Sequence, residues 1–152
     1  MLVGCCTPVP TNPNWVSDTS APNNVIYELT IRKNIGKPTG ELTKADLEEV
    51  TSLYLKNKQL TSVKGLEKCT QLTYLLLGSN QLTDTDVKGL LNLTNLDRLD
   101  LDSNQITNLK GLEKLTKLEV LWIRNNHDIT KAQIAELKKA LPKCQIEHTA
   151  TK

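Results

Sequence analysis

The chain has 152 residues, the size of a single domain with a modest core, and it contains no phenylalanine. Its net charge of +2, with acidic and basic residues interspersed, excludes the basic footprint expected of a nucleic-acid-binding protein. No apolar run reaches the roughly 18 residues that a membrane-spanning helix needs.

Residues 1–23 have the composition of a flexible tail. Four of the six prolines lie there, together with a single charged residue, Asp18. Such a segment cannot bury enough apolar surface to offset the entropy that ordering would cost. The tail also contains Leu2-Val3-Gly4-Cys5, which looks like a bacterial lipobox, the motif whose cysteine becomes lipidated.

Two interpretations of the tail stay open. The charged start and the apolar stretch of a signal peptide do not precede Cys5 in this sequence. If Cys5 is nevertheless lipidated, it tethers the domain to a bacterial cell envelope, and this anchor is the one membrane contact we expect. Otherwise Cys5 and Cys6 are exposed thiols at the start of a cytoplasmic protein.

Residues 24–49 are expected to cap the N-terminal end of a repeat array, because a terminal repeat needs a covering element. Asn23-Asn24 can begin a helix and Gly36 can end one, which favours a helix over residues 25–35. The alternating apolar residues between 25 and 31 favour a strand instead. Local sequence leaves both structures open.

Four copies of the pattern LxxLxLxxNxL fill residues 50–128. Thr43 and Asp46 indicate a one-turn helix before them, leading into a first strand over 52–56. The copies begin at residues 50, 72, 96 and 118, so the period is 22 or 24 residues. A fixed period of this kind predicts a leucine-rich repeat solenoid. In each copy the LxL pair is expected to point inward from a short parallel strand: Leu53 and Leu55, Leu75 and Leu77, Leu99 and Leu101, Leu121 and Ile123.

An asparagine follows the strand in three copies, at Asn80, Asn104 and Asn126. An amide carries both a donor and an acceptor, so stacked asparagines can bond backbone groups that would otherwise be buried unpaired. We therefore expect a structural Asn ladder and not an active site. Lys58 occupies this position in the first copy, where an end coil has only one neighbour.

Residues 129–148 are expected to form a C-terminal cap. Thr130 and Gln133 have the spacing of a capping box, and apolar residues with a helical period follow them. An extended segment is expected at 144–146, and residues 149–152 are expected to be a short tail.

The cysteines and histidines do not form a metal or catalytic motif. Cys69 occupies a column otherwise filled by leucine, so we expect it to be buried. No Cx₂C pair occurs, and His127 and His148 have no ligand partners nearby in the sequence. We expect no metal, no cofactor and no catalytic residue. Three glycines fall in Lys-Gly-Leu segments that we interpret as turns and not as phosphate-binding loops: Gly65, Gly89 and Gly111.

The stretch from about 24 to 148 resembles bacterial leucine-rich repeat proteins of the internalin-like 22-residue class. GELTKADLEEVTSL before the first strand and TKAQIAELKKALPKCQI after the last copy carry this resemblance together with the repeats. It implies an α/β fold, a right-handed solenoid with a parallel concave sheet. It also implies an N-terminal cap that begins with a helix over 25–35, a C-terminal helical cap, and a non-catalytic binding module.

Strand alternation predicts which side chains face outward on the concave sheet. When the LxL pair points inward, the residues before, between and after it point out. These positions hold aromatic residues beside charges of both signs, the usual composition of a protein-binding patch. The predicted protein-binding residues are Tyr54, Tyr74, Leu76, Arg98, Asp100, Asp102, Trp122 and Arg124.

The expected function is recognition of a protein partner through this concave face, by a monomeric chain. Aromatic residues also occupy outward strand positions by propensity alone. Two other functions stay open. One is carbohydrate or glycan binding at the bacterial envelope, because stacked aromatics and carboxylates also suit sugars. The other is a structural scaffold that self-associates.

Overall fold

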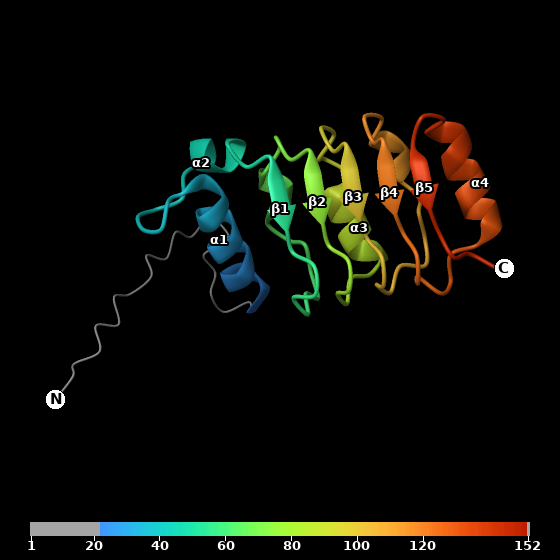
Figure 1. The fold of residues 1–152 in the computed structure, drawn as a ribbon, viewed down its shortest axis with the longest axis horizontal. Coiled ribbons are helices and arrows are strands. Elements are labelled where there is room, and N and C mark those ends of the chain that lie inside the picture. The colour runs from blue at the N-terminus through green and yellow to red at the C-terminus, as the bar shows by residue number, and fades with distance from the viewer. Residues whose placement is uncertain (1–21, 152) are drawn as a thin grey trace.

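The inward leucines of successive strands lie side by side, and this stacking organises the fold. A computed structural model describes residues 22–151 and contains a parallel sheet whose strands follow chain order (Figure 1). The α/β repeat solenoid expected from the sequence is confirmed, although the first strand is shorter than 52–56. The register aligns Leu53, Leu75, Leu99, Leu121 and Ile146 across the sheet. The strands are Ser52–Tyr54 (β1), Tyr74–Leu76 (β2), Arg98–Asp100 (β3), Val120–Trp122 (β4) and Gln145–Glu147 (β5).

A helix, α1 (Pro22–Ile35), covers the N-terminal end of the sheet, which confirms the helix implied by the resemblance (Figure 1). Tyr27 and Ile31, one helical turn apart, are fully buried, whereas Val25 and Leu29 are exposed. Burial therefore follows the helical period, because the alternating residues of this segment lie on both sides of one helix. The Tyr27 hydroxyl also donates a hydrogen bond to the carbonyl oxygen of Ser62 in the first repeat.

The tail boundary at residue 23 overlaps this helix by two residues. Proline suits the first turn of a helix, because the N–H that it lacks would have no intrahelical partner there. Pro22 therefore begins α1, and Asn23-Asn24 lie inside its first turn and not before it. Cys5 lies outside the described residues.

A short helix, α2 (Lys44–Glu48), connects the cap to β1. Thr43 and Asp46 form its capping box, as expected. The Lys37 ammonium lies 2.6 Å from Asp46 Oδ2, and its hydrogen bond, with those from Thr43, lowers the pKa of Asp46 to about 2. The capping carboxylate consequently stays ionised far into the acidic range.

Cys69 is fully buried in the column that Leu47, Leu93 and Leu115 otherwise form. Burial raises the pKa of its thiol to about 12, so the group remains protonated and behaves as a small apolar side chain. Cys144 is also buried, and both cysteines are free thiols.

Three buried asparagines join the coils below the sheet. Asn104 Oδ1 accepts a hydrogen bond from the Leu82 N–H at 3.0 Å, and its Nδ2 donates to the carbonyl oxygens of Leu77 and Leu101 at 3.1 Å. Each bond satisfies a backbone group that is out of reach of water. The same pattern occurs one coil earlier at Asn80 and one coil later at Asn126.

The direction of these bonds explains why the first copy has Lys58. Each ladder asparagine serves the coil before its own, as when Asn80 Oδ1 accepts from the N–H groups of Lys58 and Leu60, both at 3.0 Å. The element before the first coil is α1, whose backbone bonds internally. An asparagine at position 58 would have no preceding coil to serve.

The convex side of the repeats differs from the expectation at one glycine. Gly65 and Gly111 adopt positive φ angles of 103° and 105° before short 3₁₀ turns. The turn expected at Gly89 is wrong, because this residue lies inside a helix. Its repeat is two residues longer than its neighbours, and a capping box of Thr83 and Asp86 begins the helix. The elements are η1 (Leu66–Lys68), α3 (Asp84–Leu90) and η2 (Leu112–Lys114).

The two aspartates of α3 bond backbone groups of the repeats on both sides. Asp86 Oδ1 accepts from the Val63 N–H of the preceding repeat at 3.1 Å. Asp84 Oδ1 accepts from the Thr107 N–H of the following repeat at 2.7 Å, and Asp84 Oδ2 accepts from the Thr107 hydroxyl at 2.7 Å. The inserted helix thus links three coils on the convex side.

The C-terminal cap consists of α4 (Lys131–Ala140) and β5. Thr130 and Gln133 form the expected capping box, with the Thr130 hydroxyl accepting from the Gln133 N–H at 3.2 Å. In the part of the chain that the structure describes, no helix is long and apolar enough to cross a membrane.

The first residues of the segment 149–152 are not a free tail. Thr149 Oγ1 accepts a hydrogen bond from the Asn125 N–H at 2.8 Å, and Ala150 packs against the core. This correction extends the folded domain by two residues.

Asn104→Ala should lower the free energy of unfolding by about 1–3 kcal/mol, because buried backbone groups of two coils lose their partners. Lys58→Ala, at the equivalent but exposed position, should change it by less than about 0.5 kcal/mol. Urea denaturation measures both values. Equal losses at the two positions would contradict a ladder that begins at Asn80.

Asp84→Ala should lower the free energy of unfolding at neutral pH by about 1 kcal/mol. Partial burial raises the pKa of Asp84, but the hydrogen bonds from Thr107 and Asn108 lower it by a larger amount. The pKa therefore lies below the usual 3.8. A carboxylate with a lowered pKa stabilises the fold above its unfolded pKa, and this contribution is lost as the pH falls through its folded pKa.

The difference in unfolding free energy between the parent chain and Asp84→Ala should therefore stay constant down to about pH 5 and shrink below about pH 4. Denaturation curves across this range measure it. A difference that is unchanged at about pH 2 would show that the ionised carboxylate is not the stabilising group.

Candidate functional site

The outward side chains of the five strands form one surface, which we call the concave face. The burial pattern of each strand places its central residue in the core and its neighbours outward. The sequence did not predict that β5 contributes to this face, because its segment lacks the LxL pair. Ile146 alone marks the inward position there. The outward residues, from β1 to β5, are Ser52 and Tyr54, Tyr74 and Leu76, Arg98 and Asp100, Val120 and Trp122, and Gln145 and Glu147.

Two tyrosines and an arginine form a stacked row across β1, β2 and β3. The ring centroids of Tyr54 and Tyr74 lie 5.8 Å apart with the planes tilted by 39°. The Arg98 guanidinium lies 5.9 Å from the Tyr74 ring centroid, within the range of a cation–π contact. Tyr54 is 59% exposed, so the open end of the row is available to another molecule.

Asp100 points outward but is buried, with 6% exposure, which corrects its expected place on the exposed surface. A Cβ on Gly78 would lie 2.7 Å from Asp100 Oδ2, so the glycine provides the space for this carboxylate. Asp100 Oδ1 accepts from the Asp102 N–H at 2.9 Å, and Lys56 lies 3.8 Å from Oδ2. Burial raises the pKa of Asp100.

Asp102 is also buried, with 7% exposure, and is likewise not an exposed charge. Its Oδ2 accepts from Arg124 Nε at 2.9 Å and from Nη2 at 2.6 Å, while its Oδ1 accepts from the Arg124 N–H at 2.6 Å. This hydrogen-bonded pair raises the pKa of the Arg124 guanidinium. Asp102 is therefore fully occupied by one partner.

The concave face consequently shows water a different composition from the one that the sequence predicts. Its two aspartates lie beneath the surface and bond their own chain. The side chains above them are aromatic, apolar or cationic: Tyr54, Tyr74, Leu76 and Trp122 with Lys56, Arg98 and Arg124. The surface therefore offers aromatic rings and the donor groups of ion-paired cations more than free carboxylates.

A hollow of about 460 Å³ lies where α1 meets β1, at the N-terminal end of the concave face. Its walls come from the last turns of α1 and from the first repeat. Sequence reasoning missed it because the alternating apolar pattern did not show which residues of α1 face outward. The lining residues are Leu29, Thr30, Lys33, Asn34, Tyr54 and Lys58.

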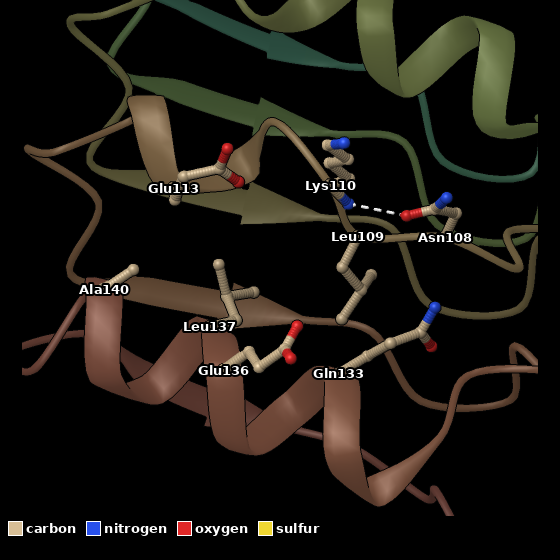
Figure 2. A pocket seen from close by; sticks show the side chains of 8 residues that line it. All are labelled: Asn108, Leu109, Lys110, Glu113, Gln133, Glu136, Leu137 and Ala140. Atoms are coloured by element: carbon tan, nitrogen blue, oxygen red, sulfur yellow. Dashed lines mark hydrogen bonds between the residues drawn. The ribbon is translucent and has the colours of Figure 1, made fainter.

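A second hollow of about 420 Å³ lies on the opposite side of the molecule, between the third repeat and α4 (Figure 2). Three of its five polar side chains, those of Asn108, Glu113 and Gln133, already bond the chain itself. Asn108 Oδ1 accepts from the Lys110 N–H at 2.8 Å, and Glu113 Oε2 accepts from the Gly111 N–H at 2.6 Å. Gln133 bonds the backbone of Thr130 and Thr107.

The apolar floor of this second hollow is formed by the buried side chains of Leu109 and Leu137 (Figure 2). The hollow is thus a seam between two packed elements, and most of its polar side chains have structural partners. Within residues 22–151, no cluster of three or more His, Cys, Asp or Glu side chains is placed to hold a metal ion.

A family model described as Leucine Rich repeats (2 copies) matches residues 94–139. No curated protein sequence matches the chain. Among solved structures, the chain is similar to an internalin, InlF, from Listeria monocytogenes, with 26% identity and a TM-score of 0.59 over 83% of this chain and 44% of that one.

Two other bacterial structures are also similar. The functional domain of InlJ from Listeria monocytogenes has 31% identity and a TM-score of 0.65, over 82% of this chain and 26% of that one. A leucine-rich repeat protein from Leptospira interrogans has 27% identity and a TM-score of 0.58, over 70% of this chain and 28% of that one. The chain spans less than half the length of each of these three structures. Its repeats, its parallel sheet and these similarities together show a leucine-rich repeat solenoid that is similar to bacterial proteins of the internalin-like class.

Proposed function

We propose that the chain is a non-catalytic binding module that recognises a protein partner through its concave face. One observation carries the proposal. The aromatic and cationic side chains of this face reach solvent, whereas its two carboxylates are buried and bonded internally. A surface with exposed aromatics and arginines, and with few free carboxylates, has the composition typical of the centre of a protein interface.

A glycan site is less well supported by the same geometry. Carboxylates in such a site accept hydrogen bonds from sugar hydroxyls, and Asp100 and Asp102 already accept from their own chain. Glu147, which β5 adds to the face, accepts from the Gln145 side chain at 2.6 Å. The exposed groups of this surface are mainly aromatic rings and hydrogen-bond donors, which favour a partner with apolar groups and hydrogen-bond acceptors of its own.

Self-association by extension of the sheet is disfavoured at the β1 edge. The helix α1 packs against that strand, and Asn34 Nδ2 donates to the Ser52 carbonyl oxygen at 2.8 Å. A carbonyl group that a second copy would need is thus already bonded. The proposed function does not depend on lipidation of Cys5, which remains a prediction from the sequence.

The test is a selection of peptides from a displayed random library against the whole immobilised chain. Peptides that bind the parent chain should lose at least about 30-fold in affinity for Tyr74→Ala and for Trp122→Ala, because truncation of a central aromatic anchor costs about 2 kcal/mol or more. Isothermal titration calorimetry with the recovered peptides measures the loss, and melting curves check that the variants fold.

The matched controls, Lys88→Ala and Lys110→Ala, remove exposed side chains on the convex side. They should leave peptide affinity unchanged. Peptides that respond to these two substitutions and ignore Tyr74→Ala and Trp122→Ala would sink the proposal and leave the fold intact.

A further inference from the structure

We propose that the hollow between α1 and β1 is a subsite for an acidic peptide segment. It would hold a carboxylate of the segment between Lys33 and Lys58 and an adjacent apolar side chain against Leu29 and Tyr54. The inference rests on the proposed function, since it names the chemistry of the partner and one place where the partner binds. Both lysines, the leucine and the tyrosine line the same hollow.

These two lysines lack carboxylate partners, whereas the other basic residues of the N-terminal cap and the first strand have them. From residue 22 to residue 58, each other lysine or arginine lies within 4 Å of a carboxylate. Lys33 and Lys58 have no such carboxylate anywhere in residues 22–151. The paired neighbours are Arg32 with Glu28, Lys37 with Asp46, Lys44 with Glu48, and Lys56 with Asp100.

Hydrogen bonds of other residues close the end of α1. The Arg32 guanidinium donates to the carbonyl oxygens of Lys37 and Gly40, in the segment after the helix, at 3.3 and 2.8 Å. The Lys37 N–H in turn donates to the Arg32 carbonyl oxygen at 3.0 Å and closes α1. The Lys33 ammonium has no hydrogen bond or ion pair with another group of residues 22–151.

Exposed apolar side chains lie at the same place. Among the described residues, the large apolar side chains with the greatest exposure are Val25, Leu29 and Tyr54, at 40, 64 and 59%. Leu29 and Tyr54 line the same hollow, and Val25 lies one turn before Leu29 on α1. Tyr54 also continues into the row with Tyr74. Exposed apolar surface of this kind marks interaction sites.

The two features together select the occupant. Two unpaired ammonium groups attract a carboxylate and repel a basic segment. The leucine and the tyrosine ring favour a neighbouring aliphatic or aromatic side chain. A segment with an Asp or Glu next to an apolar residue satisfies both, and its remaining length can cross the concave face toward Arg98 and Trp122.

The test uses the peptides selected against the whole chain and a charge-reversed chain, Lys33→Glu with Lys58→Glu. Peptides selected on the parent should be enriched in Asp or Glu beside Leu, Ile, Phe or Tyr, and should bind the reversed chain at least about tenfold more weakly. Selection on the reversed chain should yield Lys or Arg in place of the acidic residue.

Two further variants make the result specific. Lys33→Gln with Lys58→Gln removes the charges without placing an acidic residue in the last turn of α1, where it would disfavour the helix. Lys64→Glu with Lys114→Glu makes the same change of charge on the convex side, just before η1 and at the end of η2, and should leave peptide affinity unchanged at moderate salt.

The outcomes separate this inference from the proposed function. Selected peptides without an acidic preference, or with equal affinity for the parent and the Lys33→Gln, Lys58→Gln chain, would overturn the subsite. If those peptides still required Tyr74 and Trp122, the proposed function would stand without it. Recovery of no peptide above background would overturn both. A loss that the convex control reproduces would show general charge attraction and would also overturn the subsite.

Discussion

The structure depends on one constraint, which is that every coil turns its backbone inside an apolar stack where water cannot bond the peptide groups. Asn80, Asn104 and Asn126 meet this constraint from below the sheet, because each amide bonds the coil before its own. Asp84 and Asp86 meet it on the convex side, where they reach the repeats on both sides of α3. The buried polar side chains of the repeats are therefore engaged by the backbone, and the strands can stay short and closely aligned.

These internal hydrogen bonds determine which side chains of the concave face stay available to a partner. Asp100 and Asp102 are drawn under the concave face by an adjacent N–H, by the space above Gly78 and by the fork of Arg124. The face above them consequently carries rings and cations. Trp122 lies on β4 of this face, Arg98 and the two tyrosines form a row across β3 to β1, and Tyr54 also lines the hollow against α1. A surface of this kind selects its partner through apolar contact and donated hydrogen bonds, and the unpaired lysines of the adjoining hollow disfavour basic segments.

Much of the fold could be predicted because its signals repeat. The inward leucines, the ladder asparagines and the capping box at Thr130 each have a spacing that one structure explains. The N-terminal helix could not be derived from its own residues, since the alternation from 25 to 31 fits a strand as well as a helix with two exposed apolar positions. Gly89 misled because a local Lys-Gly-Leu match does not reveal the two-residue insertion that makes its segment helical. Strand alternation could not predict the burial of Asp100 and Asp102. It predicts which way a side chain points, but not whether neighbouring side chains cover it. The hollow of Lys33 and Lys58 joins residues that no sequence period relates.

The central claim is that a partner binds across the concave face and the adjoining side of α1, and not in the seam beside α4. Amide hydrogen exchange, measured with and without the tightest selected peptide, tests it most directly. The account predicts slower exchange in the last turns of α1 and in β1 to β4 when the peptide is bound. It also predicts unchanged exchange at the N-terminal half of α4 and at η2. Protection confined to α4 and η2, with none in β1 to β4, would contradict it.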